Sequence, residues 1–222
     1  MGLSRRDEIL LHAARLFSEK GVAATTVRDI AEEVGILSGS LYHYFAAKDS
    51  IAYAIVIAFI DDLNAKYERA KVAGESARER LDRMVAASFE AAIAHPYATE
   101  IYQNEGLAAL GGDVERMRTA VEVSNRHWAG AVAQGVSGGE LRADVDAAQF
   151  HRMLRESVWT TVRFNRVSLP ELADQLRRDT IAVFLDGFTA RADAPDPEDP
   201  LAKLQHDVVE LQRMLTELRD RA

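Results

Sequence analysis

Apolar residues recur along the chain at spacings of three and four, which is the period of an α-helix buried on one face. No segment alternates apolar and polar residues in the way that a half-buried strand does. We therefore expect an all-α fold. Helices are predicted over residues 47–70, 76–94, 97–109, 113–136, 146–166 and 170–190, with glycine or proline near most of their ends.

The helix expected over residues 47–70 contains the longest apolar run of the chain, Ile51–Ile60. This run is about half the length needed to cross a bilayer, and acidic residues flank it on both sides. Charged residues at 5–8 interrupt the pattern of a secretory signal. We therefore expect a cytoplasmic protein without a membrane partner. Because helix 47–70 is apolar all round near its start, it is expected to be covered from two sides and to link two parts of the protein.

Residues 24–48 describe two short helices joined by a tight turn. Thr25 or Thr26 can cap the first helix by accepting a backbone N–H. Gly35 can adopt the left-handed conformation that ends a helix, and Ser38 can cap the second one. The inward positions of the first helix and the turn are Val27, Ile30, Ala31, Val34 and Ile36.

The second of these helices, expected over residues 39–45, presents small and hydrogen-bonding side chains outward. Leu41 and Phe45 face the core, so Gly39, Ser40, Tyr42, His43 and Tyr44 are left mostly outside. Such a surface suits a helix that lies in the major groove of DNA, where small residues allow close approach and hydroxyl groups reach bases or phosphates. Lys48 follows, where its ammonium group can meet a phosphate. The alternative is a helical hairpin with incidental polar residues.

Over residues 5–52 the sequence resembles the TetR family of transcriptional regulators. The resemblance implies an all-helical homodimer with an N-terminal helix-turn-helix DNA-binding domain and a larger C-terminal domain that holds a small-molecule effector. It rests on Ala13, Leu16, Phe17, Gly21, Thr26, Ile30, Ala31, Gly35, Ser38, Leu41, Tyr42, Phe45 and Lys48.

The same resemblance implies which residues meet double-stranded operator DNA. Base contacts would fall near Gly39, Ser40 and Tyr42. Arg28, on the first turn of the preceding helix, is a further candidate for DNA binding. Phosphate contacts would fall on Thr26, Ser38, Tyr42, His43 and Lys48.

The charge balance is unusual for a nucleic-acid-binding protein. The chain has 27 Lys and Arg against 35 Asp and Glu, a net charge of −8, and residues 1–50 hold six basic and seven acidic side chains. Bulk charge therefore contributes little to DNA attraction, and local geometry has to contribute more. We expect few phosphate contacts per subunit. The chain contains no cysteine, which excludes disulfides and thiolate metal sites.

The helix expected over residues 146–166 carries an unusual polar face, on which Arg152, Arg155, Arg163 and Arg166 surround Trp159. Guanidinium groups bind phosphate or carboxylate, and an indole stacks on planar rings, so this face could bind an anionic planar ligand. It could equally be a solvated face whose arginines pair with nearby acidic residues. The residues alone leave both interpretations open.

Residues 101–105 and 155–159 are similar to segments of TetR-family repressors of steroid-ring degradation, a branch that responds to CoA thioesters. The resemblance implies an acyl-CoA effector, with no cofactor and no metal. Arg155 and Trp159 would meet the CoA portion, with Gln103 and Arg163 as further candidates for ligand binding. The acyl group would enter an apolar cavity lined by residues such as Phe89, Ile93, Ile101, Tyr102 and Leu107.

The helix expected over residues 170–190 has apolar residues on more than one side. In a TetR-like architecture this helix and the preceding one pair with their symmetry mates in a homodimer. The alternative is the central helix of a monomeric bundle. A dimer also suits recognition, because two reading helices roughly 34–36 Å apart match successive major grooves of a pseudo-palindromic operator.

The composition changes after residue 190. Residues 191–200 form an acidic, proline-punctuated linker, and residues 201–222 show an a/d heptad pattern of leucines and valine. This last segment would form an intersubunit coiled coil or dock on the body as an amphipathic tail. The expected organisation is a DNA-binding domain (1–50), an effector and dimerisation domain (51–190), the linker (191–200) and the C-terminal helix (201–222).

Catalytic signatures are absent from the sequence. It shows no zinc-protease histidine pair, nucleophile elbow or phosphate-binding glycine loop, and its six histidines lack ligand spacing. A chance acid–base group of Glu100 or Glu105 with His127 or His151 is the weak exception. We therefore expect a regulator rather than an enzyme, with no catalytic residue. The expected function is that of a repressor released from DNA by its effector. One alternative is a TetR-like regulator of efflux or other metabolism with an apolar non-CoA ligand. A more remote alternative is a helical enzyme or an interaction scaffold.

Overall fold

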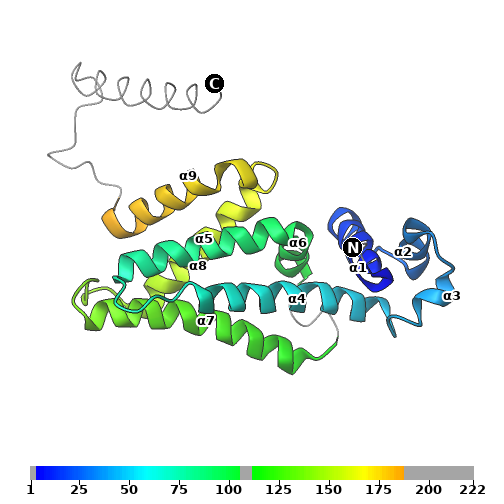
Figure 1. The fold of residues 1–222 in the computed structure, drawn as a ribbon, viewed down its shortest axis with the longest axis horizontal. Coiled ribbons are helices and arrows are strands. Elements are labelled where there is room, and N and C mark those ends of the chain that lie inside the picture. The colour runs from blue at the N-terminus through cyan, green and yellow to red at the C-terminus, as the bar shows by residue number, and fades with distance from the viewer. Residues whose placement is uncertain (1–3, 106–111, 188–222) are drawn as a thin grey trace, which may run out of the picture. The chain divides into compact units, whose positions relative to one another are not determined.

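A computed structural model describes residues 4–105 and 112–187 of the chain (Figure 1). These residues form helices and contain no strand, which confirms the expected fold class. The linker at 191–200 and the heptad segment at 201–222 lie outside the described residues. The helices are α1 (Arg5–Lys20), α2 (Val27–Val34), α3 (Ser38–Leu41), α4 (Lys48–Arg69), α5 (Ala77–Ala94), α6 (Pro96–Glu105), α7 (Val114–Ser137), α8 (Ala147–Asn165), α9 (Leu169–Ile181) and the π-helical segment η2 (Ala182–Asp186).

The start of α2 is fixed by a reciprocal cap between Thr26 and Asp29. The Asp29 N–H donates to Thr26 Oγ1 at 3.1 Å, and the Thr26 N–H donates to the Asp29 carboxylate at 2.8 Å. This arrangement satisfies N–H groups that the first helical turn leaves free. Thr25, the other candidate, is instead buried and donates its hydroxyl to the carbonyl of Gly21 at 2.8 Å. Thr26 is therefore the cap of α2.

Gly35 ends α2 in the left-handed conformation that the sequence predicted, with φ +74° and ψ 37°. Its N–H donates to the carbonyl of Glu32 at 3.2 Å, and the N–H of Ile36 reaches back to Ala31 at 2.9 Å. These bonds satisfy carbonyls at the end of the helix. A side chain at position 35 would strain this backbone, because residues with a Cβ rarely adopt it.

The second helix of the motif differs from the expectation in length and in its cap. It covers Ser38–Leu41 rather than 39–45, and Leu37 occupies the cap position without a side-chain hydrogen bond, so the prediction that Ser38 caps this helix is wrong. The N–H of Tyr44 donates to the carbonyl of Leu41 at 3.0 Å, closing a tighter turn. This turn carries the chain on to Phe45, whose ring is buried in the same core as Leu41.

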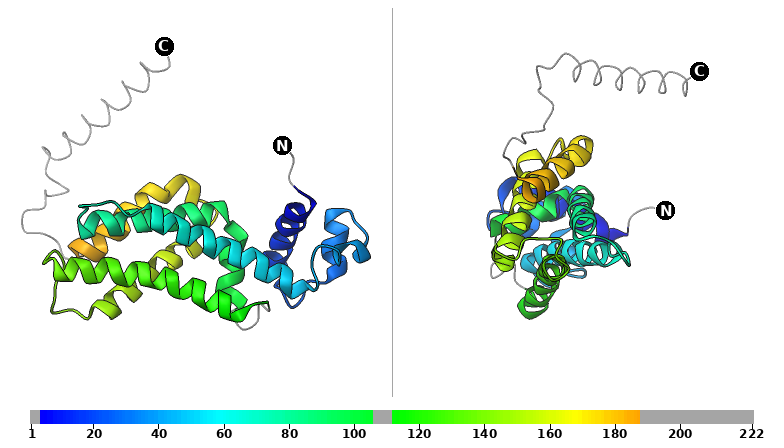
Figure 2. Two further views of the ribbon diagram at one scale, coloured as in Figure 1. Left: turned by 60° about the horizontal axis from the view of Figure 1, so that its bottom comes forward. Right: turned by 90° about the vertical axis from the view of Figure 1, so that its left-hand side faces the viewer.

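The helix α4 connects the helix-turn-helix with the helices that follow it (Figures 1 and 2). Near its start it packs against α1, and further along it packs against α5, α6 and α7. Ile51, Ala52 and Val56 on this helix are fully buried. The helix α9 packs on α5, and α8 packs between α7 and α9 in contact with both. Among the described helices, none combines the length and the apolar character that a bilayer crossing requires.

The helix predicted over residues 170–190 is not continuous, because the α-helix α9 ends at Ile181 and the π-helical segment η2 follows it, while residues 188–190 lie outside the described part. Several large apolar side chains are exposed on a single chain. They lie on α8, α9 and η2 and in the connection between α8 and α9. Phe164 is 81% exposed and Val167 is 90% exposed. Met153, Leu172 and Val183 add to this exposed apolar surface.

Gly135 on α7 provides a test of the packing between α5, α7 and the residues after α7. A Cβ at position 135 would lie 2.6 Å from Ala77 Cβ and 2.7 Å from Leu141 Cδ1. We expect Gly135→Ala to destabilise the protein by about 1–3 kcal/mol, as overpacking does, measured by denaturant unfolding. Gly130→Ala on the same helix is the control, because its Cβ would meet nothing within 4 Å. That variant should be neutral or more stable, and an equally stable Gly135→Ala would contradict the packing.

Candidate functional site

The surface around α3 presents most of the side chains predicted to meet DNA. Gly39, Tyr42 and His43 are exposed, with Tyr42 at 56% of its full exposure, while Ser38 and Ser40 are half-buried. Leu37, which sequence reasoning overlooked, is 80% exposed at the start of α3. The spacing of apolar residues does not distinguish Leu37 from a core position. Its place directly before Ser38 and Gly39, at the start of the predicted helix, was the one available signal.

Thr26 and Arg28 lie exposed at the start of α2, but both already have intramolecular partners. The Thr26 hydroxyl hydrogen-bonds the Asp29 carboxylate at 2.8 Å. The Arg28 Nε donates to Glu32 at 2.7 Å, and this hydrogen bond raises the pKa of the guanidinium. A phosphate would therefore have to share or replace these partners.

Lys48 has a structural role in addition to its predicted contact with DNA. Its ammonium group donates to the backbone carbonyls of Val22 and Ala23, the latter at 3.2 Å, in the connection between α1 and α2. The first residue of α4 therefore holds the connection that precedes the helix-turn-helix. Since an ammonium group has three N–H donors, one is left for a phosphate.

A cavity of about 430 Å³ lies between α4, α6, α7 and α8. Its volume falls within the range of small-molecule sites, which is about 300–1,000 Å³. One wall is apolar and another carries amide, carboxylate and guanidinium groups. The lining residues are Phe59, Ile60, Leu63, Tyr67, Thr99, Tyr102, Gln103, Val121, Ser124, Asn125, Trp128, Arg155, Glu156, Trp159, Thr160 and Arg163.

Hydrogen bonds hold the aromatic groups at the inner end of this cavity. The Trp128 Nε1–H donates to the Tyr67 hydroxyl at 3.1 Å, and the Tyr67 and Ser88 hydroxyls are 2.7 Å apart. Burial raises the pKa of Tyr67 to about 12, so the phenol stays protonated. This inner end is therefore a fixed, uncharged surface.

Arg155 and Trp159 of α8 turn toward the cavity together. The guanidinium of Arg155 donates to the Asn125 side chain and to Glu156, the latter from Nη2 at 2.7 Å. The indole of Trp159 meets the ring of Phe59 edge-on, with centroids 5.8 Å apart. Burial, followed by the charges of Arg155 and Arg152, lowers the pKa of His151 one turn earlier. The polar wall of the cavity is thus electropositive apart from Glu156.

The cavity brings together five of the residues predicted to bind the ligand, namely Tyr102, Gln103, Arg155, Trp159 and Arg163. Arg152 and Arg166 do not line it, so the arginine cluster of α8 is divided rather than gathered around Trp159. Three further predicted residues do not line it either. Phe89 and Ile101 are buried in the packed core, and Ile93 is exposed on α5.

Leu107 lies outside the described residues. Sequence reasoning missed several lining residues, among them Tyr67, Asn125 and Trp128. Their helical spacing resembles that of ordinary core positions, so the spacing alone gave no signal for them. The placement of an asparagine between core positions of α7 was the one available hint.

A polar bridge joins α1 to α6 and α8 beside the cavity. Glu100 of α6 accepts hydrogen bonds from the Ser18 hydroxyl of α1 and from the guanidinium of Arg166, the C-cap residue of α8. Arg166 also donates to Ser18 Oγ at 3.2 Å. A second cavity of about 120 Å³ includes Glu100, Arg166 and Gln103, and Gln103 also lines the larger cavity.

Among the described side chains, the acid–base pair that the sequence left open is not formed by Glu100, and the side chain of Glu105 lies outside the described part. The hydrogen-bond partners of Glu100 are Ser18 and Arg166 rather than a histidine. His127 lies 4.0 Å from Glu68, and His151 lies beside arginines. Within residues 4–105 and 112–187, no group of three or more histidine, aspartate or glutamate side chains is placed to hold a metal ion.

The protein combines a capped helix-turn-helix, whose second helix is polar and exposed, with a helical bundle that holds a ligand-sized cavity. The helix α4 joins the two parts. This combination defines a DNA-binding transcriptional regulator. A family model described as "Bacterial regulatory proteins, tetR family" matches residues 9–55. The HTH-type transcriptional repressor KstR2 of Rhodococcus jostii is 37% identical over 187 residues, which are 84% of this chain and 92% of the relative. The chain belongs to the TetR family.

Solved structures agree with this assignment. The structure of the ketosteroid transcriptional regulator KstR2 of Mycobacterium tuberculosis matches 86% of this chain and 98% of its own, at 36% identity and a TM-score of 0.76. FadR of Bacillus subtilis in complex with stearoyl-CoA shares the fold at 19% identity and a TM-score of 0.60, over 82% of this chain and 99% of its own.

Membership in the family establishes the partners that the sequence predicted. The protein is a regulator that binds operator DNA and a small-molecule effector and acts as a homodimer. The apolar surface that α8 and α9 expose on a single chain is consistent with a dimer interface built from these helices.

Proposed function

We propose that this protein is a repressor released from its operator by an acyl-CoA thioester bound in the cavity of about 430 Å³. The observation that carries the proposal is the pairing of an apolar wall with Arg155, Arg163 and Trp159 in one cavity. An acyl group fits the apolar wall, guanidinium groups bind phosphates, and an indole can stack on the adenine ring.

The ion pair between Arg155 and Glu156 leaves room for an anionic ligand. The side chain of Arg155 is 18% exposed, whereas that of Glu156 is 66% exposed. An ion pair with so exposed a partner contributes little, about 0–1 kcal/mol. Glu156 can therefore turn into solvent when a ligand phosphate takes its place.

The relatives support the acyl-CoA assignment. KstR2 of M. tuberculosis is described as a ketosteroid regulator, and FadR of B. subtilis holds stearoyl-CoA within the same fold. The second candidate is an apolar ligand without CoA, as in a regulator of efflux or other metabolism. The apolar side chains of Phe59, Ile60, Leu63 and Val121 in the cavity wall favour it.

The DNA-binding surface is proposed to consist of the exposed face of α3 and its neighbours. Hydroxyl and ammonium groups would meet phosphates, while the small residues of α3 would allow the helix to approach bases. Leu37 adds an apolar group suited to a thymine methyl. The proposed contact residues are Leu37 and the predicted set, Thr26, Arg28, Ser38, Gly39, Ser40, Tyr42, His43 and Lys48.

Effector binding is proposed to reach the DNA-binding helices through α6. Gln103 lines the cavity and donates to the carbonyl of Trp159 at 3.3 Å, and Glu100 one turn earlier binds Ser18 of α1. A ligand that separates α6 from α8 would therefore alter the support of α1. Inverting a 1:99 population takes about 5.5 kcal/mol of differential binding, so the effector has to be well enclosed.

The experiment that tests this function is selection of bound fragments from genomic DNA, followed by titration of acyl-CoAs, free acids and apolar compounds. We expect enrichment of a pseudo-palindromic site and its release by acyl-CoA at concentrations where the free acid has no effect. Release by an uncharged apolar compound alone would favour the second candidate. Failure to enrich any site would contradict DNA regulation.

The bridge at Glu100 leads to a further prediction. The effector lowers DNA affinity by a certain factor. We expect Glu100→Gln to change that factor roughly 2- to 30-fold, equivalent to about 0.5–2 kcal/mol of coupling. The reason is that the neutral amide binds Arg166 less strongly and loosens the contact with Ser18. The measurement is operator binding with and without saturating effector.

Asp61→Asn is the matched control for Glu100→Gln. Asp61 makes an exposed ion pair with Arg116 between α4 and α7, at 2.7 Å, outside the cavity. This variant should leave the coupling unchanged. Because coupling is reciprocal, effector affinity measured with and without operator must give the same factor. A Glu100→Gln protein with wild-type coupling would remove the bridge from the proposed route.

A further inference from the structure

The cations of the DNA-binding motif are almost all engaged within the protein. Arg5 pairs with Glu8, Arg15 with Glu33, Lys20 with Asp29 and Arg28 with Glu32, while Lys48 binds backbone carbonyls. Among the arginines and lysines of residues 4–50, Arg6 alone has neither a carboxylate nor a carbonyl partner. Its charge is therefore the least compensated of this set.

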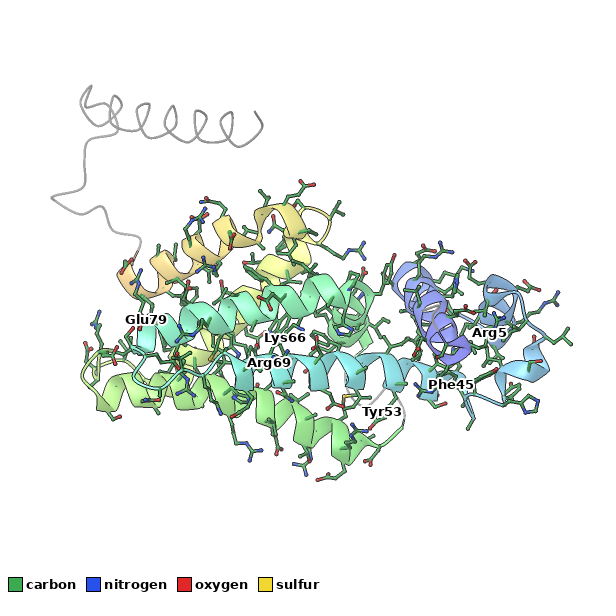
Figure 3. All side chains as sticks on the ribbon, viewed as in Figure 1. Arg5, Phe45, Tyr53, Lys66, Arg69 and Glu79 are labelled. Atoms are coloured by element: carbon green, nitrogen blue, oxygen red, sulfur yellow. The ribbon has the colours of Figure 1, made fainter. Side chains whose placement is uncertain are left out.

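The position of Arg6 is fixed by an aromatic contact. Its guanidinium carbon lies 4.9 Å from the centroid of the Phe45 ring. Phe45 is buried and its N–H donates to the carbonyl of Leu41, the last residue of α3, at 3.1 Å. Figure 3 labels Phe45 and also Arg5, the residue before Arg6, in the part of the molecule formed by α1, α2 and the start of α4.

A contact of this kind holds the guanidinium carbon over the ring without using the hydrogen-bonding groups of Arg6. A planar guanidinium over a ring keeps its N–H donors in the plane, where they can bind a phosphate in bidentate fashion. The neighbouring acids do not use these donors, because Asp7 binds the Ser4 hydroxyl and Glu8 binds Arg5.

We infer that Arg6 is a phosphate-binding residue of the operator complex, held next to α3 by Phe45. This inference rests on the proposed DNA-binding surface and adds to it a residue from α1. It answers the problem posed by the charge balance: six basic and seven acidic side chains in residues 1–50 leave little net attraction. Phosphate binding then depends on individual cations that the fold leaves available.

The test is the salt dependence of operator binding by the full-length dimer. The logarithm of the affinity falls with the logarithm of salt concentration by about 0.9 for each neutralised phosphate. We expect Arg6→Gln to reduce the magnitude of this slope by about 1.8, one phosphate in each of two subunits. When the salt concentration is lowered tenfold, from 1 M to 0.1 M, the affinity of this variant should therefore rise roughly 60-fold less than that of the wild-type protein.

Arg5→Gln is the matched control, since it removes the same charge from the adjacent residue, which is already paired with Glu8. It should leave the slope nearly unchanged. Arg6→Lys retains the charge and should recover most of the slope, which guards against a folding defect in Arg6→Gln. Thermal unfolding of each variant accompanies the titrations.

Two results would overturn the inference. One is a wild-type slope for a folded Arg6→Gln protein. The other is an equal loss of slope in Arg5→Gln, which would mean that any charge removed from α1 has the same effect. Failure of the wild-type protein to bind a selected DNA site would instead contradict the proposed function itself.

Discussion

Replacing Tyr42 with alanine is expected to lower operator affinity roughly 100-fold while leaving effector binding intact. The side chain is 56% exposed at the C-cap of α3 and is not one of the buried core residues. A hydrogen bond to a charged phosphate is worth about 1.5 kcal/mol, and the dimer would make two of them with the proposed contact. Their combined loss of about 3 kcal/mol corresponds to roughly 100-fold. Titration of a labelled operator fragment measures this change.

Tyr42→Phe separates the hydroxyl from the ring and should reproduce most of the loss. Lys48→Ala should also weaken binding, but its effect is less clean because Lys48 supports the carbonyls of Val22 and Ala23. Its unfolding free energy should therefore fall as well. Wild-type operator affinity in both Tyr42→Ala and Lys48→Ala would show that the assigned contacts are wrong.

Replacing Trp159 with alanine is expected to abolish the response to acyl-CoA at concentrations that release the wild-type protein. Stacking of a base on an aromatic side chain is worth about 1–3 kcal/mol, which is roughly 5- to 150-fold in affinity. Trp159 lines the cavity and is braced by Phe59, so its loss also opens the apolar wall. Calorimetric titration with acyl-CoA measures the affinity, and operator affinity without effector should stay unchanged.

A pair of arginine variants distinguishes a CoA contact from a general loss of shape. Arg155→Gln removes a guanidinium that lines the cavity, whereas Arg152→Gln removes an exposed one that binds Gln149 on the same helix. Only Arg155→Gln should lower acyl-CoA affinity. Equal affinities for the CoA thioester and the free acid in the wild-type protein would contradict the assignment of this wall to CoA.

Local features of the helix-turn-helix could be predicted from sequence because they depend on a few neighbouring residues. The reciprocal cap at Thr26 and the left-handed Gly35 follow from chemistry within three or four positions. The length of α3 did not follow from such chemistry. The helix ends at Leu41, and the tighter turn closed by the Tyr44 N–H brings Phe45 into the core, a turn that apolar spacing does not distinguish from a longer helix.

The cavity could be predicted only in part, because periodicity marks which residues face inward and not whether the interior is filled there. Phe89 and Trp128 both occupy inward positions, yet Phe89 is packed in the core and Trp128 lines the cavity. Trp128 borders the space that α4, α6, α7 and α8 leave unfilled, whereas Phe89 does not. Arg155 and Trp159 were predicted to bind ligand because their chemistry is unusual on a helix face rather than because of their spacing. Their roles and the domain boundaries stay predictions.

The continuity of α4 makes small movements near the cavity large at the DNA. Phe59 lines the cavity on the same helix whose first residue, Lys48, is beside the helix-turn-helix. At 1.5 Å per residue the two lie roughly 16 Å apart, so a tilt of α4 by about 10°, together with the proposed effect through α6, would displace the far end by roughly 3 Å. A displacement of that size in each subunit, in opposite directions, alters the distance between the two α3 helices by a substantial fraction of a groove width. Under the proposed function, the ligand would need to shift its own surroundings only slightly to spoil the fit to an operator of fixed repeat.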